Sequence, residues 1–280
     1  MQSNMVQKAP HFGLPASRNF KMMIRFANRF LVCFRSATFL GLGLAMCVQA
    51  QTQANLPIGA QLKVHGLLWD AHEVTVAQVK RFAQKTGFVS RAEKEGGGSI
   101  YEAGWAIKKG WTWRSPFGVA AHDHEPAVHL TFDEAQKICQ HEGKRLPRDS
   151  EWVNAAYVEN RTQVPADFIS GKRYRYPNGD SARQSHCLEG CSATQGTAPS
   201  GALWRGTGHV PVMTTRPGVN GLYDMGGNVW EWVDTGNGEE RVTRGGSWWY
   251  DASRQVADDL ATKPKDTRVG YIGFRCVAAF

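Results

Sequence analysis

Apolar residues recur at helical spacing in two stretches, and each stretch begins with a capping motif. Residues 75–78 have the sequence Thr-Val-Ala-Gln and residues 131–134 have the sequence Thr-Phe-Asp-Glu, which are two capping boxes. The stretches end at Gly87 and Gly143, where a glycine commonly terminates a helix. The pattern predicts two helices here and a third, shorter helix over Ser150–Tyr157.

The remainder of the chain is rich in Gly, Pro and Trp, and turn dipeptides such as Asn220-Gly221 interrupt it. Short strands are predicted at Val210–Thr214, Val229–Val233, Val242–Trp248 and Gly273–Ala278. A few helices and many short strands joined by long loops indicate an α+β domain. Loops of this length are usually functional or are held by ions or bridges.

The first 50 residues have the order of a secretory signal peptide. Basic residues end at Arg35, the apolar run Ala37–Val48 is too short to span a bilayer, and small residues lead up to Ala50. We expect cleavage after Ala50, a periplasmic or secreted product of one domain over residues 51–280, and no membrane contact afterwards. An uncleaved anchor is the alternative. A lipoprotein at Cys47 is a third option, which Met46 disfavours because a lipobox has a small residue there.

The net charge of +8 lies mostly in this leader. The first 50 residues hold six basic and no acidic residues, so the rest of the chain has 27 basic against 25 acidic residues. A body this close to neutral lacks the positive surface that binds phosphate backbones. The charge distribution therefore argues against a nucleic-acid partner.

Four cysteines remain once the leader is removed: Cys139, Cys187, Cys191 and Cys276. An even number of cysteines in an oxidising compartment predicts two disulfides. Four cysteines allow three connectivities, and their spacing does not choose among them.

A group of histidines and carboxylates precedes the second helix: His122, Asp123, His124, Glu125 and His129. Imidazole and carboxylate ligands suit iron, zinc or manganese, so a redox metal is one hypothesis for this group. A hydrated loop leading into the helix is the alternative that we favour. The sequence contains no phosphate loop and no nucleophile elbow.

Eight segments in a fixed order resemble the formylglycine-generating enzyme, or sulfatase-modifying factor, family. They are His72–Thr75, Thr86–Phe88, Trp113–Gly118, Glu125–His129, Gly143–Pro147, Gly221–Trp232, Arg244–Trp248 and Gly273–Cys276. Each segment is weakly specific alone, but together they extend over most of the predicted domain. The resemblance implies a C-type-lectin-like α+β fold with little regular secondary structure.

The chain departs from the catalytic members of this family after Ser247. Those members carry two cysteines, five residues apart, that bind copper(I) and oxidise a substrate cysteine with oxygen. The matching positions here are Tyr250 and Gln255. A phenol and an amide cannot replace thiolates as copper(I) ligands, and Cys276 belongs to the terminal motif. We therefore expect no copper and no formylglycine generation by that route.

The resemblance also places Trp230 and Ser247 in the family's active-site cleft. Further candidates for its walls are Trp111, Trp113, Arg114, Trp248 and Trp249. Aromatic grooves suit peptides, sugars and flat rings. The alternative is that many of these tryptophans belong to the hydrophobic core.

A structural calcium ion is a further implication of the resemblance, with ligands at the positions of Asp224, Gly227, Val229 and Glu231. The alternative is that Glu231 holds this turn through hydrogen bonds without metal. Relatives with cysteines at the positions of Cys139 and Cys276 pair them, which implies a second bond between Cys187 and Cys191. Buried free thiols at Cys139 and Cys276 are the alternative.

Two functions fit these observations. The first is a non-catalytic accessory protein that binds an exported protein, peptide or glycan through an aromatic cleft. The second is a periplasmic tailoring oxidase or modifying enzyme, without the cysteine pair, that acts on a secreted metabolite such as a siderophore. The resemblance includes periplasmic members without the cysteine pair that are linked to siderophore maturation. The family fold also tolerates loss of chemistry, so the fold alone does not decide between the two functions.

Overall fold

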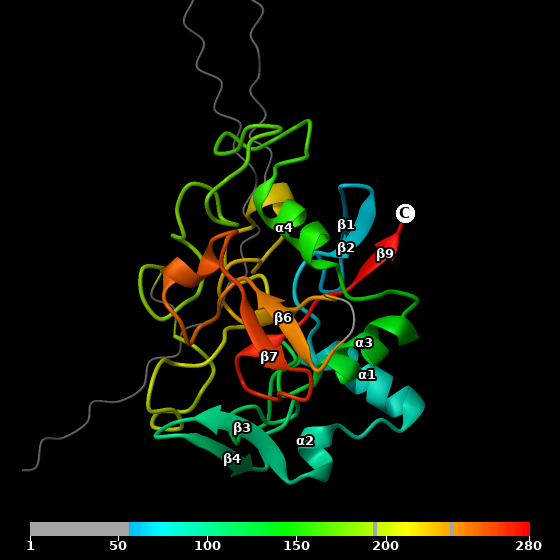
Figure 1. The fold of residues 1–280 in the computed structure, drawn as a ribbon, viewed down its shortest axis with the longest axis vertical. Coiled ribbons are helices and arrows are strands. Elements are labelled where there is room, and N and C mark those ends of the chain that lie inside the picture. The colour runs from blue at the N-terminus through cyan, green and yellow to red at the C-terminus, as the bar shows by residue number, and fades with distance from the viewer. Residues whose placement is uncertain (1–55, 193–194, 236–237) are drawn as a thin grey trace, which may run out of the picture. The chain divides into compact units, whose positions relative to one another are not determined.

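The two predicted capping boxes both form in the structure (Figure 1). Helix α1 (Val76–Thr86) follows Thr75 and ends at Gly87, which has a φ of 69°. Helix α3 (Phe132–His141) follows Thr131. Helix α4 (Asp149–Tyr157) begins one residue before the predicted stretch. A short helix that the pattern did not predict, α2 (Arg91–Lys94), has a capping box of its own.

The computed structural model describes residues 56–192, 195–235 and 238–280. The signal peptide predicted for residues 1–50 lies outside these ranges, so its cleavage stays a prediction. The compact unit that contains all the elements is Ala54–Phe280. None of the helices in the described ranges is long and apolar enough to cross a membrane.

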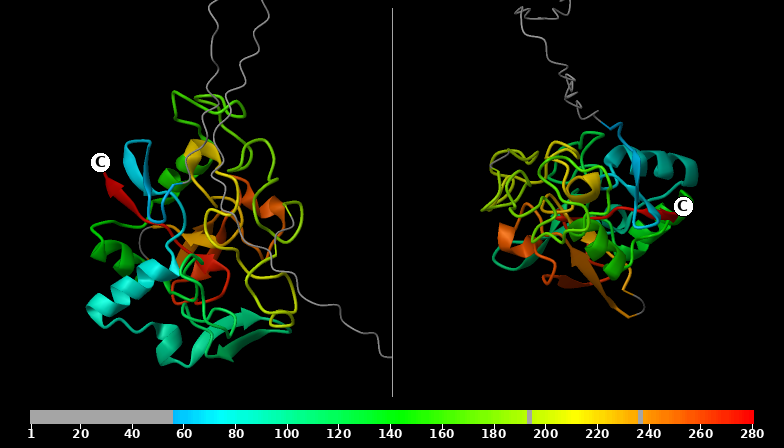
Figure 2. Two further views of the ribbon diagram at one scale, coloured as in Figure 1. Left: turned by 180° about the vertical axis from the view of Figure 1, so that it is seen from behind. Right: turned by 90° about the horizontal axis from the view of Figure 1, so that it is seen from above.

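Three small sheets make up the strand content of the described residues. The first contains β1 (Gln61–Val64), β2 (Leu67–Asp70) and β9 (Val277–Ala279), and the second is the β3 (Gly97–Tyr101)–β4 (Trp105–Lys109) hairpin. The third has the order β7 (Ala261–Pro264), β6 (Glu240–Arg244), β5 (Trp230–Trp232) and β8 (Ile272–Gly273). Two 3-10 turns, η1 (Val219–Gly221) and η2 (Ala252–Gln255), lie in the loops. This is the predicted α+β architecture, and Figure 2 shows β9 beside the β1–β2 hairpin.

Three strand predictions need correction. The stretch Gly273–Ala278 is not one strand but divides into β8 and β9 of different sheets, because the carbonyl of Phe274 between them accepts from the N–H of Val74 outside both sheets. The stretch Val210–Thr214 is not a strand, because Pro211 has no N–H to donate and the N–H of Val210 donates to the side chain of Asn228 instead of to a neighbouring strand. The strand predicted to reach Trp248 ends at Arg244. The next residue, Gly245, has a φ of 98°, and a Cβ there would lie 2.6 Å from the carbonyl oxygen of Met225.

Both disulfides implied by the family resemblance form, Cys139–Cys276 and Cys187–Cys191. The first ties the buried face of α3 to the residue before β9, and both of its cysteines are buried. The second joins two cysteines that are 4 positions apart in a surface loop. The long bridge therefore fastens the C-terminal strand to the core, whereas the short bridge shapes one loop.

Candidate functional site

The segment that follows β6 contains Tyr250 and Gln255, which the motif resemblance matches to the cysteine pair of the catalytic family members. Ser247 is buried at its start, and η2 ends at Gln255, which is fully buried. The half-buried ring of Tyr250 lies edge-on to the rings of Trp230 and Tyr271, at centroid distances of 5.8 and 5.9 Å. An aromatic cluster and a buried amide thus occupy these two positions.

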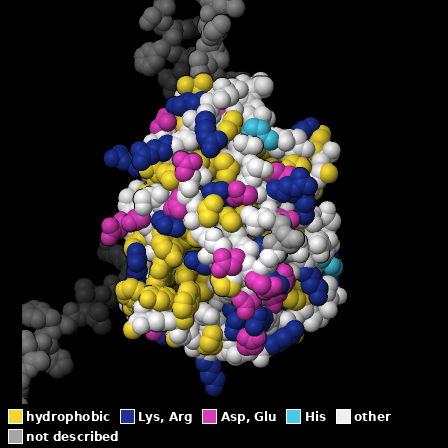
Figure 3. Space-filling model, in the orientation of Figure 1, with side chains coloured by type: hydrophobic (Ala, Val, Ile, Leu, Met, Phe, Trp, Pro, Cys, Tyr) yellow, Lys and Arg dark blue, Asp and Glu magenta, His cyan; other side chains and the backbone are white. Residues whose placement is uncertain are grey.

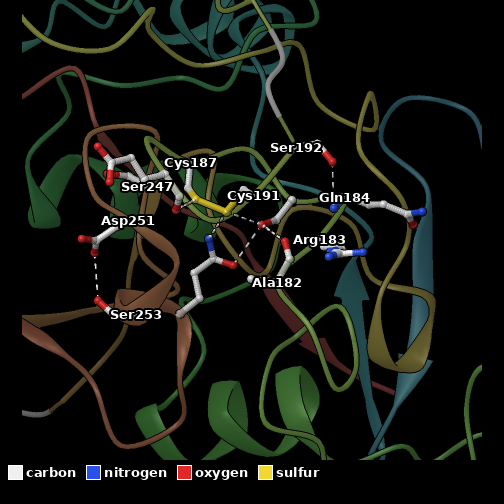
Figure 4. The surroundings of a disulfide bond; sticks show 12 residues. Ala182, Arg183, Gln184, Cys187, Cys191, Ser192, Ser247, Asp251 and Ser253 are labelled. Carbon is white, nitrogen blue, oxygen red and sulfur yellow. Dashed lines mark hydrogen bonds between the residues drawn. A yellow bond between two sulfur atoms is a disulfide. The ribbon is translucent and has the colours of Figure 1, made fainter.

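A second loop, residues 185–191, packs along this segment. The N–H of Leu188 donates to the carbonyl of Tyr250 at 2.9 Å, and the N–H of Ala252 donates to the carbonyl of Glu189 at 2.9 Å. These two bonds hold the Cys187–Cys191 disulfide against η2 (Figure 4). No sequence pattern predicted this contact, because the two segments are some sixty residues apart.

Polar side chains meet the sulfur of Cys191 at this contact (Figure 4). Gln255 donates from Nε2 to this sulfur at 3.2 Å. The hydroxyl of Ser185 lies 3.1 Å from the same sulfur, 3.0 Å from Gln255 Oε1 and 2.7 Å from the carbonyl oxygen of Ala182. The single hydroxyl hydrogen can serve only one of these acceptors at a time. The buried amide of Gln255 is thus held against a sulfur of the Cys187–Cys191 disulfide.

A cavity of about 460 Å³ opens beside the disulfide, and its walls include His186, Cys187, Thr207 and Trp248. This volume is within the range of small-ligand sites. Burial lowers the pKa of His186, whose Nε2 lies 2.8 Å from the carbonyl oxygen of Gly208, so this imidazole is neutral near pH 7. The cavity is therefore lined by a disulfide, a neutral imidazole and one indole ring.

The tryptophans expected in an aromatic cleft are mostly core residues. All five are buried: Trp111, Trp113, Trp230, Trp248 and Trp249. Of the candidate wall residues, Trp248 faces the cavity. Arg114 is on the surface, where its guanidinium lies 4.0 Å from the ring centroid of Trp113 and pairs with Glu93. The core alternative accounts for these side chains because long loops need large apolar residues to bury them.

A different set of aromatic side chains is exposed. Trp105 is 60% exposed, Trp204 is 58% exposed and Tyr101 is 45% exposed. Trp204 donates its indole N–H to the carbonyl of Tyr101, and the rings of Tyr101 and Trp105 meet edge-on at 5.5 Å. Figure 3 shows hydrophobic side chains gathered over and beside the β3–β4 hairpin. We call Tyr101, Trp105, Ile107 and Trp204 the aromatic strip.

The positions of the expected calcium ligands are occupied by protein partners. The carboxylate of Glu231 accepts from Arg275 Nε at 2.8 Å, from Arg275 Nη2 at 2.6 Å and from Trp152 Nε1 at 2.8 Å. Asp224 accepts from the N–H of Met213 and from the hydroxyl of Thr215. A guanidinium already neutralises Glu231, so a calcium ion bound through this carboxylate does not fit the arrangement. Hydrogen bonds account for these contacts as the alternative expects, and calcium binding at this turn stays an untested prediction.

Gly227 and Val229, the other two expected ligand positions, are buried in the same turn. Glu73 is buried beside it and accepts from the side-chain amide of Asn228 at 3.1 Å. Burial, together with the charges of Asp224 and Glu231, raises the pKa of Glu73 well above its usual value. Arg275 therefore compensates several buried carboxyl groups at once.

The histidine and carboxylate group before α3 does not converge on one point. The carboxylate of Glu125 lies 2.8 Å from His209 Nε2 and also accepts from the backbone N–H of His122. Asp123 pairs with Lys80. His129 is buried elsewhere, between the carbonyl oxygens of Pro116 and Arg268. His124 lines a separate surface cavity with His122. Across the described ranges, no group of three or more His, Cys, Asp or Glu side chains is arranged to hold a metal ion.

Comparisons with known proteins agree with this architecture. The profile of the sulfatase-modifying factor enzyme 1-like domain matches residues 44–280. The formylglycine-generating enzyme of Streptomyces coelicolor is 30% identical over 253 residues, which cover 74% of this chain and 76% of that protein. The mouse protein named inactive C-alpha-formylglycine-generating enzyme 2 is 31% identical over 182 residues, 60% of this chain and 54% of that protein.

A solved structure shows the same fold. PvdO from Pseudomonas aeruginosa superposes with a TM-score of 0.51 at 18% sequence identity, over 76% of this chain and 80% of that chain. At this level of identity the likeness concerns the fold alone. Together with the profile match, it confirms the C-type-lectin-like α+β fold that the sequence motifs predicted.

Proposed function

Because the chain belongs to the sulfatase-modifying factor family, we propose that it is an exported member that binds a peptide segment of another exported protein and does not generate formylglycine. The observation that carries this proposal is the aromatic strip. Three large aromatic side chains and Ile107, which is 53% exposed, lie together in solvent. Apolar surface concentrated in this way is typical of interaction sites.

The form of the strip favours a peptide over a glycan. Ile107 is aliphatic and offers no flat face for a sugar ring, but it suits an apolar side chain. In the described part of the chain, β4 pairs only with β3, so its outer edge presents free backbone N–H and C=O groups. An extended peptide can add to such an edge while its side chains contact the aromatic rings.

Three further observations support the proposal. Tyr250 and Gln255 replace the copper thiolates, which removes the ligands of the family's known reaction. A relative named as inactive, the mouse protein above, is similar over 60% of this chain. Two disulfides suit an oxidising compartment, as does the signal-peptide pattern of the first 50 residues.

Peptide display provides the test. Peptides selected from a random library against the purified protein are measured by fluorescence anisotropy. Loss of a buried anchor residue costs about 2 kcal/mol, so we expect the Trp105→Ala and Trp204→Ala variants to bind roughly thirtyfold more weakly. Ile169→Ala is the matched control, because Ile169 is 61% exposed but lies outside the strip. Equal weakening by all three variants, or failure of the library to yield any binding peptide, contradicts the proposal.

A further inference from the structure

The two disulfides differ in their access to small molecules. Cys139 and Cys276 are both buried, and neither lines the cavity beside η2. Cys187 forms part of the wall of that cavity, and Cys191 is half-buried at the surface. A molecule that enters the cavity therefore contacts a residue of this disulfide without unfolding of the protein, whereas the other disulfide is enclosed in the core.

The two sulfurs of the accessible bond also differ in polar surroundings. Cys191 Sγ faces the amide of Gln255 at 3.2 Å and the hydroxyl of Ser185 at 3.1 Å, and both of these side chains are buried. Hydrogen-bond donors stabilise a thiolate, and a thiolate attracts the Ser185 hydrogen more strongly than a disulfide sulfur does. Cys187 Sγ instead lies 3.0 Å from the carbonyl oxygen of Glu189, an acceptor that suits a protonated thiol.

We propose that the Cys187–Cys191 disulfide is a reactive centre that oxidises a dithiol ligand in this cavity. A thiolate of the ligand attacks Sγ of Cys187, the S–S bond breaks, and its electron pair leaves on Sγ of Cys191. The second ligand thiolate then attacks the ligand sulfur of the mixed disulfide and releases Cys187 as a thiolate. The ligand loses two electrons and two protons and becomes a disulfide, and the protein gains two thiols.

The direction of attack follows from the polar surroundings. The sulfur with the lower thiol pKa is the better leaving group, and Cys191 has the donors. Loss of this bond also leaves the fold largely intact. In the chain-entropy model a disulfide stabilises more when it closes a longer loop, and this one joins residues only 4 positions apart, against 137 for Cys139 and Cys276. The reactive bond can therefore open and close in a folded protein.

The first experiment needs no variant, because the Cys139–Cys276 disulfide of the same protein serves as the control. The native protein is incubated with increasing dithiothreitol, quenched by alkylation and mapped by mass spectrometry. We expect Cys187 and Cys191 to be alkylated at least tenfold earlier in the titration than Cys139 and Cys276, and the melting temperature to change little. Simultaneous reduction of both bonds, or reduction that occurs only with unfolding, overturns the proposal.

A second experiment tests the roles of the two sulfurs. With glutathione as the probe, rapid acid quenching is expected to trap the mixed disulfide on Cys187. In a Cys187→Ser background, the pH profile of iodoacetamide alkylation is expected to give Cys191 a pKa below the ordinary value of about 8.5. Trapping on Cys191, or an ordinary thiol pKa, contradicts the assignment.

Variants of the two donors complete the test. In the same background, Ser185→Ala and Gln255→Leu are expected to raise the Cys191 pKa, and in the otherwise native chain to slow glutathione exchange roughly threefold. Ser253→Ala is the control, since this exposed serine bonds to Asp251 and not to the disulfide. This chemistry does not depend on the aromatic strip, so Trp105→Ala should leave the exchange rate unchanged even if peptide binding is lost.

Discussion

Arg275 is the residue whose loss tests the buried centre of the fold most directly. Its guanidinium is fully buried and makes two hydrogen bonds to Glu231, one to the carbonyl of Tyr223 and one to the carbonyl of Asp70. Burial lowers its pKa, but the charge of Glu231 more than offsets this, so the pKa of Arg275 is raised. We expect Arg275→Met to keep the volume and remove all of these bonds.

The expected loss of stability in Arg275→Met is large because the charge of Glu231 is left without its cationic partner. Glu231 would keep only the bond from Trp152, and removal of one partner of a buried ion pair costs about 3–5 kcal/mol. For a domain of this size that corresponds to a fall in melting temperature of roughly 6–20 °C. Arg275 also lowers the pKa of Glu73, so its loss should raise that pKa further. A carboxyl group whose pKa is higher in the folded state than in the unfolded state makes the protein less stable as the pH rises. The loss of unfolding free energy caused by Arg275→Met should therefore be greater at pH 8 than at pH 5.

Urea denaturation at both pH values, with and without calcium, provides the measurement. Arg148→Met is the control, because the Arg148 side chain is 71% exposed and its loss should cost less than about 0.5 kcal/mol. The native protein should unfold at the same urea concentration in EDTA and in calcium, since Arg275 occupies the carboxylate that calcium would need. A deficit below about 1 kcal/mol, or a clear stabilisation of the native protein by calcium, would refute this account of the turn.

Other expectations follow from the same structure. Burial lowers the pKa of His129 to about 4 from 6.5, so the free energy of unfolding should fall by about 3 kcal/mol as the pH drops from 6.5 to 4. His129→Asn should flatten this part of the pH profile of stability measured by urea denaturation. Replacing Cys139 and Cys276 by alanine should cost about 5 kcal/mol in the same assay. Gly98→Ala should cost about 1–3 kcal/mol, because its Cβ would lie 2.0 Å from the imidazole of His129, whereas Gly104→Ala meets no atom within 4 Å and should be neutral. A Cys-x-Pro-x-Arg peptide incubated with the protein, copper and oxygen should keep its sulfur, as mass spectrometry would show.

Local signals in the sequence predicted local structure well. The capping boxes at Thr75 and Thr131 specify helix starts through residues only three positions apart, so each helix begins where expected. The Val210–Thr214 strand failed because its backbone partner is a side chain 18 residues away, Asn228. Propensity alone cannot represent such a contact.

The candidate site was harder to predict, since its parts are distant in sequence. The motif resemblance located Gln255 but not its contact with Cys191, which is 64 residues away. Likewise, Arg275 lies 44 residues from Glu231, and nothing local marks it as the cation that this carboxylate binds. The sequence also could not predict that Trp204 is exposed and Trp113 is buried, because aromatic residues occur both on surfaces and in cores.

The pairing of β9 with β2 has a consequence for how the domain is made. Leu67 pairs with Ala279 and Trp69 with Val277, so β2 finds its partner more than 200 residues further along the chain. A nascent chain that ends after α4 leaves one edge of β2 unpaired and Cys139 without Cys276. The β1–β2–β9 sheet and the Cys139–Cys276 disulfide therefore cannot form until this distant segment has been synthesised, and contacts this distant along the chain favour slow folding.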